Sequence, residues 1–280
     1  MRDIEAREIR DAVARLCVQA NCTLPDDVRE ALADARTRET WQPACEVLDT
    51  IGENVRIAAE EQVPMCQDTG AACVFVELGH DVHIVGGLLQ DAVDAGVAQG
   101  YVDGCLRKSI VADPLRRENT DDNTPAFLHV DLAEGDALKI VVAPKGGGSE
   151  MWSRVAMLKP ADGAAGVERF VCDAVKEAGS NPCPPVVVGV GIGGTFDTVP
   201  LLAKRALLRR TGQPNADGFY ADMEARLLSQ VNKQRTGPAG FGGVTTALSV
   251  AVEVAPTHIA TLPVAVCLNC HVARHAEVVL

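Results

Sequence analysis

The fold is organised around a loop and the strand that it enters, which read Val63-Pro64-Met65-Cys66-Gln67-Asp68-Thr69-Gly70-Ala71-Ala72-Cys73-Val74-Phe75-Val76-Glu77-Leu78. Residues 71–78 form an apolar run, which predicts a buried strand. The loop before it sets a thiol, an amide, a carboxylate and a hydroxyl side by side, between a proline and a glycine. Polar groups presented at the end of a core strand are typical of catalytic loops. We therefore expect other polar motifs of the chain to supply partners for this loop.

The composition describes an ordinary globular protein. The chain has 280 residues, of which 47% are hydrophobic and 23% charged, so it can bury a large core. It has no apolar run of about 18 residues and no apolar N-terminal segment, which predicts no spanning helix and a cytoplasmic location. The formal net charge of -12 argues against nucleic acid or an anionic membrane as a partner. An anionic substrate would need a local group of cations.

The chain contains 10 cysteines, spread along its length. In a reducing compartment most such thiols are buried apolar residues, and the others bind metals or take part in redox reactions. Cys17, Cys73 and Cys172 lie within expected helices or strands, so we predict them in the core. Three others stand beside proline or polar residues at element boundaries: Cys66, Cys183 and Cys270. These three are the candidates for chemistry.

Apolar spacing predicts intermixed helices and strands. Helices are expected at 4–18, from Pro25 onward, after a cap at Thr40, and at about 88–104, 164–178, 198–208 and 221–234. Strands are expected at 71–78, 82–85, 126–132, 137–143, 186–190, 247–254 and 259–267. The connection between 132 and 137 has a length suited to a hairpin. We therefore expect a mixed α/β fold as one domain, 1–280, in which an N-terminal helical layer, 1–60, supports an α/β core, 61–280, of mixed sheets with flanking helices.

Three consecutive glycines follow the strand expected at 137–143, in Lys145-Gly146-Gly147-Gly148-Ser149. Such a run costs backbone entropy, and it is best explained where the main chain approaches a ligand closely or presents N–H groups to an anion. A flexible linker is the alternative, but linkers are usually longer and more polar. The polar loop 113–125 is rich in turn-forming residues, so it is either a flexible surface loop or a loop of the site. Of the two, we expect the surface loop.

Gly189, Gly191 and Gly194 match the dinucleotide-binding pattern G-x-G-x-x-G. That pattern also requires a second strand ending in an acidic residue about 20 positions later. Residues 209–214 occupy that region, and no strand precedes them. Packing of a helix on the strand, or an anion at the N-terminus of the helix expected from 198, explains the glycines better. A dehydrogenase that uses NAD is therefore disfavoured.

Cys267 and Cys270 form a C-x-x-C pair, which is half of a structural zinc site. No second pair exists in the chain. A redox pair is a further alternative, but such motifs normally open a helix, whereas Cys267 lies in an expected strand. The isolated Cys66, Cys183 and Cys270 suit a different group, an iron–sulfur cluster held by three thiolates with one iron left open.

Six short motifs follow one another along the chain. They are Cys66-Gln67-Asp68-Thr69-Gly70, Lys145-Gly146-Gly147-Gly148-Ser149, Gly191-Ile192-Gly193-Gly194, Gly242-Gly243-Val244-Thr245-Thr246, Pro256-Thr257-His258, and Asn269-Cys270 with Arg274-His275. From about residue 40 onward the chain resembles the class I, iron–sulfur fumarate hydratases and the related L(+)-tartrate dehydratases. It is similar to the separate α subunit of this family, which corresponds to the N-terminal domain of the single-chain enzymes.

The resemblance implies a cofactor and a set of site residues. Carried over motif by motif, the ligands of a [4Fe–4S] cluster fall on Cys66, Cys183 and Cys270, catalytic groups on Asp68 and His258, and substrate-binding groups on Gln67, Arg107, Lys145, Gly146 and Gly147. An arginine can clamp a carboxylate through two hydrogen bonds, and an open iron can act as a Lewis acid on a departing hydroxyl. Residues 61–280 would then carry both the cluster and the substrate.

By resemblance, the first expectation is the reversible hydration of fumarate to malate, a reaction of the tricarboxylic acid cycle. The alternative is the dehydration of L(+)-tartrate, and a further alternative is a non-catalytic iron–sulfur or zinc protein. In the family, a partner domain or β subunit supplies a hydroxyl and several cationic groups. We therefore expect a heteromer, of α2β2 type, that acts on a small dicarboxylate, with a chain that is inactive or nearly so when alone.

Overall fold

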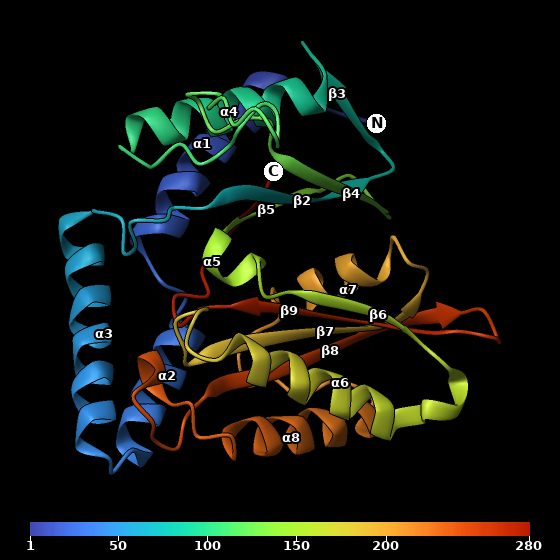
Figure 1. Cartoon of the computed structure of the whole chain (residues 1–280). Coiled ribbons are helices and arrows are strands. Elements are labelled where there is room, and N and C mark those ends of the chain that lie inside the picture. Colours follow the sequence, from blue (N-terminus) through green and yellow to red (C-terminus); the bar gives the residue numbers. More distant parts are fainter. The chain divides into compact units, whose positions relative to one another are not determined.

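The computed structural model describes all residues, 1–280, and confirms a mixed α/β fold (Figure 1). Contacts within the chain define two compact units. The first consists of Met1–Pro25, Asn54–Gly147 and Arg274–Leu280, and the second of Asp26–Glu53 and Gly148–Ala273. None of the helices combines the length and the apolar character that a bilayer crossing requires.

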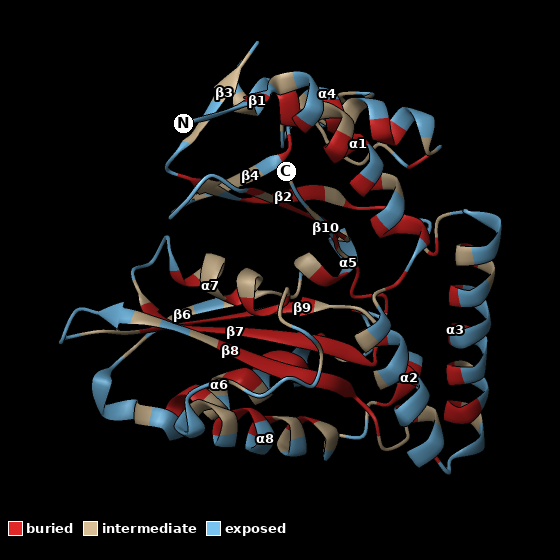
Figure 2. Cartoon of the chain, turned by 180° about the vertical axis from the view of Figure 1, so that it is seen from behind, coloured by how far each residue is buried: buried red, intermediate tan, exposed pale blue.

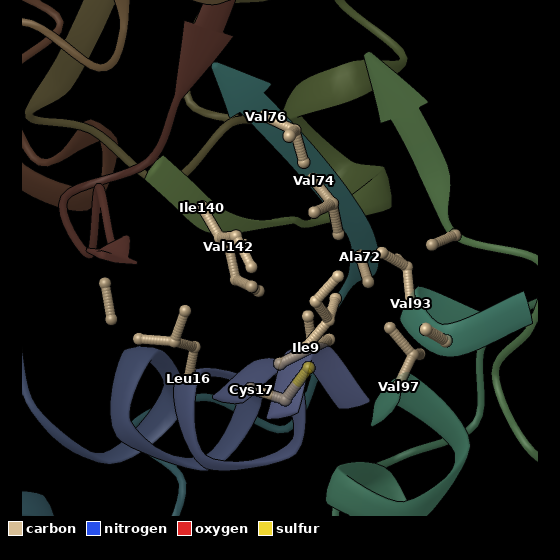
Figure 3. Close-up of a cluster of buried hydrophobic side chains, with 14 of the residues drawn as sticks. Ile9, Leu16, Cys17, Ala72, Val74, Val76, Val93, Val97, Ile140 and Val142 are labelled. Atoms are coloured by element: carbon tan, nitrogen blue, oxygen red, sulfur yellow. The ribbon is translucent and has the colours of Figure 1, made fainter. Parts of the chain in front are cut away.

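The first unit is a four-stranded sheet with two helices on one face. Its strands are, in spatial order, β10 (Ala276–Val279), β5 (Leu138–Lys145), β2 (Ala71–Gly79) and β4 (Phe127–Ala133). Its helices are α1 (Ala6–Cys22) and α4 (Leu89–Asp103). Alternate residues of β2 and β5 point at both helices, as Figure 3 shows for Val74 and Val142. This alternation is the period-2 pattern of a strand with one face on a core.

The expectation that strands 126–132 and 137–143 form a hairpin is wrong. Strand β2 lies between β4 and β5, pairing parallel with β4 and antiparallel with β5. The short connection from β4 to β5 instead crosses the end of β2, where Gly79 N donates to Ala137 O and Asp81 N to Gly135 O. Connection length alone does not reveal an inserted strand, because β2 comes from more than forty residues earlier in the sequence.

The N-terminal helices differ from the expectation in one detail. Residues 2–5 form strand β1 (Arg2–Glu5), which pairs parallel with β3 (Val82–Val85), so the first helix begins at Ala6. Helix α2 covers Asp26–Arg38 and helix α3 covers Gln42–Glu61. Before α3, the main-chain N–H groups of Thr40 and Trp41 donate to the Glu39 carboxylate.

The second unit is a four-stranded sheet with helices on both faces. Its strands are, in spatial order, β6 (Arg154–Leu158), β9 (Leu262–Asn269), β7 (Val186–Gly194) and β8 (Ala247–Thr257). Helices α6 (Gly163–Ala178) and α8 (Gly218–Asn232) cover one face, and α7 (Val199–Ala206) packs on β7 and β9. Short helical turns lie at α5 (Gly147–Glu150), η1 (Pro160–Asp162) and η2 (Pro238–Gly240). Figure 2 shows the buried residues of this sheet in red.

The central strand β7 is buried along both faces, as its apolar run predicts. The glycines expected to follow that strand are part of it. A Cβ at Gly189 would lie 2.2 Å from Ala203 O, and one at Gly191 would lie 2.4 Å from Val199 O. These glycines therefore let α7 pack directly on the strand, which is the packing explanation of the G-x-G-x-x-G pattern.

Candidate active site

The Asp68 carboxylate lies against the glycine-rich segment at the end of β5. Asp68 Oδ1 accepts a hydrogen bond from Gly70 N at 3.1 Å, and Oδ2 accepts one from Gly147 N at 2.8 Å. A Cβ at Gly146 would lie 3.4 Å from Oδ2. The glycine-rich segment thus presents a main-chain N–H group to an anion, one of the two explanations offered for its glycines, although this anion is a carboxylate of the protein itself.

Arg107 is joined to the same loop through Thr69. The buried Thr69 hydroxyl accepts from Arg107 N at 2.9 Å and donates to Arg107 O at 3.1 Å. The Arg107 residue is exposed. One hydroxyl therefore ties the main chain of the exposed Arg107 to Thr69, the residue after Asp68. Gln67 is also exposed, with its Oε1 3.5 Å from Cys66 Sγ.

The turn into β2 requires a glycine. Gly70 has φ +76°, and a Cβ there would lie 2.7 Å from the carbonyl carbon of Lys145. Lys145 pairs with Ala71 in the β2–β5 ladder and is 8% exposed. The first unit therefore brings together Cys66, Gln67, Asp68, Arg107, Lys145, Gly146 and Gly147.

Cys183 and Cys270 lie together in the second unit. Cys183 is exposed, has φ +54°, and comes shortly before β7. Cys270 directly follows β9, whose last residue Asn269 pairs with Val187 near the start of β7. His271 joins the two segments, since its main-chain N donates to Cys183 O at 3.2 Å and its Nδ1 lies 2.9 Å from the same oxygen.

His258 lies at the opposite end of that sheet. It follows Thr257, the last residue of β8, which pairs with Gly194 at the far end of β7. The length of β7 puts it about 25 Å from the end that carries Cys183 and Cys270. Within one chain, the second unit does not bring His258 to these cysteines.

The donor set fits an iron–sulfur cluster by its chemistry. None of the cysteines is in a disulfide, and Cys66, Cys183 and Cys270 all have solvent-accessible surface. Of the three thiols expected in the core, Cys17 and Cys73 are buried, and burial raises the pKa of Cys17 to about 12. The expectation is wrong for Cys172, which is only partly buried. No three His, Cys, Asp or Glu side chains of the chain form a ready group for a metal ion. The assignment of Cys66, Cys183 and Cys270 as ligands therefore depends on the chemistry of thiols and on the sequence motifs.

Three buried side chains hold the main chain of the Cys66 loop, and none of them was predicted to have a role in the site. Tyr101 Oη donates to Thr69 O and Gly70 O, Asn123 Nδ2 donates to Gly70 O, and Arg274 Nη2 donates to Asp68 O. Asn123 lies in the loop 113–125, which was expected at the surface. Its side chain is fully buried, so the expectation is wrong for this residue. Arg274 was already part of the motif Arg274-His275, but no role was predicted for it.

Comparisons with known proteins identify the family. The family model described as fumarate hydratase (Fumerase) matches residues 10–279. A "Putative L(+)-tartrate dehydratase subunit alpha" of Methanocaldococcus jannaschii is 40% identical over 275 residues, covering 96% of each chain. The L(+)-tartrate dehydratase subunit alpha of Escherichia coli UTI89 is 31% identical, over 95% of this chain and 89% of its own. That of strain K12 is 30% identical, over 98% and 91%.

The match begins at residue 10, so it also includes the first helices, which lie outside the resemblance drawn from the motifs. The relatives are each matched over nearly their whole length. The chain therefore belongs to the fumarate hydratase (Fumerase) family, as an α-subunit chain of the class I fumarate hydratases and L(+)-tartrate dehydratases, which are hydro-lyases.

Proposed function

We propose that this chain is the cluster-bearing α subunit of a heteromeric, [4Fe–4S]-dependent hydro-lyase that acts on a small 2-hydroxy dicarboxylate. The observation that carries the proposal is the carboxylate of Asp68, held by two main-chain N–H groups in a loop that Thr69 ties to the main chain of the exposed Arg107. A positioned carboxylate, in a loop joined to a segment that carries an exposed arginine, suits the removal of a proton from a carbon beside a carboxylate group. Family membership supports the reaction class.

Each residue then has a role in the proposal. Cys66, Cys183 and Cys270 would hold the cluster, which when bound supplies a Lewis acid for the departing hydroxyl. Arg107 would bind one substrate carboxylate, and Gln67 would orient it by hydrogen bonding. The hydrogen bonds from Gly70 and Gly147 fix both oxygens of Asp68, whose remaining lone pairs can accept a substrate proton. Lys145, Gly146 and Gly147 would complete the wall of the site.

The proposed role of His258 requires a second copy of the chain. His258 is exposed, and it lies a full strand length from Cys183 and Cys270. An α2β2 assembly would contain two copies of this chain, so His258 of one copy could act in the site of the other. The β subunit would add the remaining cationic groups. The cysteines are all outside disulfides, which supports a reducing compartment such as the cytoplasm for this assembly.

Two substrates are candidates. Hydration of fumarate to malate is the reaction that the motifs favour first. L(+)-tartrate is the second, and the printed names of the relatives favour it. The two substrates differ by one hydroxyl group, and a site built to hydrogen-bond a hydroxyl discriminates strongly against an analogue that lacks it.

The test is to co-express the chain with a β subunit, reconstitute the pair anaerobically with iron and sulfide, and assay malate, fumarate and L(+)-tartrate. We expect turnover of one dicarboxylate and a [4Fe–4S] spectrum that this compound perturbs. Arg107→Gln should raise KM for that compound, whereas Arg116→Gln, in the loop 113–125, serves as the matched control. A pair that binds the cluster but turns over none of the three compounds would contradict the proposal.

A further inference from the structure

Three consecutive carbonyl groups of the Cys66 loop are held by buried side chains. Asp68 O accepts from Arg274 at 2.5 Å, Thr69 O from Tyr101 at 3.0 Å, and Gly70 O from Tyr101 at 2.8 Å and Asn123 at 3.2 Å. The three donors come from different parts of the first unit: the segment before β10, helix α4 and the loop 113–125. The main chain that carries Asp68 is therefore fixed from several sides.

Arg274 differs from the other two donors because it carries a charge. Only 4% of the residue is exposed, and its Nε has no hydrogen-bond partner. It forms no ion pair with a carboxylate of the chain; its hydrogen bond goes to the main-chain oxygen of Asp68. Burial also raises the pKa of Tyr101, so the neighbouring phenol remains neutral and does not balance the guanidinium.

A buried cation without a counter-ion is costly, and a neutral donor would hold a carbonyl at a lower cost. Tyr101 and Asn123 do so at the next two residues. Packing therefore does not account for an arginine at this position. The charge has a use if anions bind beside the loop, since a fixed and preorganised positive charge in a low-dielectric environment stabilises them.

We propose that Arg274 is a positioning residue of the site. Its guanidinium fixes the peptide that joins Asp68 to Thr69, and thus the direction of the Asp68 carboxylate, and its unbalanced charge favours the dianionic substrate that binds there. This inference rests on the proposed function for its substrate, and on the hydrogen bond to Asp68 O for its structural part.

The structural part is tested in the chain itself by hydrogen–deuterium exchange, without a cluster or a substrate. In Arg274→Gln, amides of residues 66–71 should exchange at least about tenfold faster, because the Asp68 carbonyl loses its anchor. Val142→Ala is the control, since it removes buried apolar volume from the same unit and should change exchange in β5 and its neighbours instead. If Arg274→Gln does not accumulate as a folded chain, the same exchange measurement is made on Arg274→Lys.

The functional part is tested in the reconstituted pair by separating kcat from KM. Arg274→Lys keeps the charge but loses the planar fork, so kcat should fall about tenfold with KM nearly unchanged. Arg274→Gln loses both, so kcat should fall about a hundredfold and KM should rise. In Arg274→Ala, guanidinium ions below the denaturing concentration should restore part of kcat. Tyr101→Phe, which keeps the charge, should show no such rescue.

The inference is overturned if Arg274→Gln exchanges like the parent chain at 66–71, or if all amides of the unit accelerate equally and guanidinium rescues nothing. The second result would make Arg274 a core residue only. Failure of the proposed function is a different result: the parent pair would then turn over no dicarboxylate, while the exchange measurement would still decide whether Arg274 anchors the loop.

Discussion

The hydroxyl of Thr69 forms two hydrogen bonds with the main chain of Arg107: it accepts one from the Arg107 N–H and donates one to the Arg107 carbonyl oxygen. Thr69 belongs to the loop of Cys66 and Asp68, and Arg107 to a segment that follows helix α4. The two segments thus share one side chain that serves as both donor and acceptor. The position of the Arg107 main chain relative to the loop therefore depends on the Thr69 side chain.

Replacing Thr69 by valine tests this relationship. The variant leaves the N–H and the carbonyl of Arg107 without that partner, which should cost about 1–3 kcal/mol of stability. It should also raise KM for the dicarboxylate by about tenfold, because the arginine is no longer fixed. Thr69→Ser keeps the hydroxyl and should retain most of both properties. Equal KM values for the valine and serine variants would contradict the interpretation.

Gly70→Ala should be strongly destabilising for two reasons. The position has φ +76°, and a Cβ there would lie within 3 Å of the Lys145 main chain. Gly135→Ala is the matched control, since Gly135 also has a positive φ, +89°, but has open space around its Cα. Positive φ alone costs about 1–2 kcal/mol for alanine, so we expect the Gly70 variant to lose clearly more than that. Urea unfolding of both variants measures the difference.

The proposed ligands can be identified by alkylation with iodoacetamide and mass spectrometry. In the cluster-free chain, the exposed Cys105 and Cys183 should react quickly, and Cys17 should not react, because burial raises its pKa to about 12. After anaerobic reconstitution, Cys66, Cys183 and Cys270 should be protected together. Cys105 should remain reactive and serves as the internal control. Protection of any other set of three would reject the ligand assignment.

Glu39 should make part of the stability depend on pH. Burial acts to raise the pKa of its carboxyl, but hydrogen bonds from the N–H groups of Trp41, Val244 and Thr40 outweigh burial and hold the pKa below its usual value. A lowered folded-state pKa adds stability above the unfolded pKa, and this stability is lost as pH falls through the folded value.

We therefore expect Glu39→Gln to be less stable than the parent chain at pH 7, by about 1–3 kcal/mol. The difference should shrink below about pH 4, where the parent carboxyl takes up its proton. Melting temperatures between pH 3 and 8 measure this, with the exposed Glu134→Gln as control. A difference between parent and variant that does not change with pH would rule out the charge of Glu39 as its cause.

The position of His258 predicts complementation between inactive chains. Asp68→Asn and His258→Asn should each be inactive or nearly so in the reconstituted pair. Mixed assemblies of the two variants should regain part of the activity, because one site would then receive Asp68 from one copy and His258 from the other. His258→Asn alone should bind iron like the parent. No activity in mixed assemblies would show that His258 does not act across copies.

The sequence was sufficient for elements whose pattern is local. The apolar runs at 71–78 and 186–190 and the helical spacing at 164–178 were found close to their true positions. Strand β10 and the insertion of β2 between β4 and β5 were missed, because both depend on pairing between distant segments. The same distinction applies to the site. Asp68 and Arg107 belong to motifs, whereas Tyr101 and Asn123 contribute through contacts that exist only in the folded chain.

The pairing of β5 with β10 has a consequence for protein synthesis. Strand β10 comes from residues 276–279, and Arg274 lies just before it, whereas the loop that they help to hold is made some two hundred residues earlier. A ribosome must therefore synthesise both units before the sheet of the first unit can contain all its strands. The loop of Cys66 acquires its last anchor late, so an iron–sulfur assembly system that delivers to the native loop would act on the chain after translation has passed residue 279.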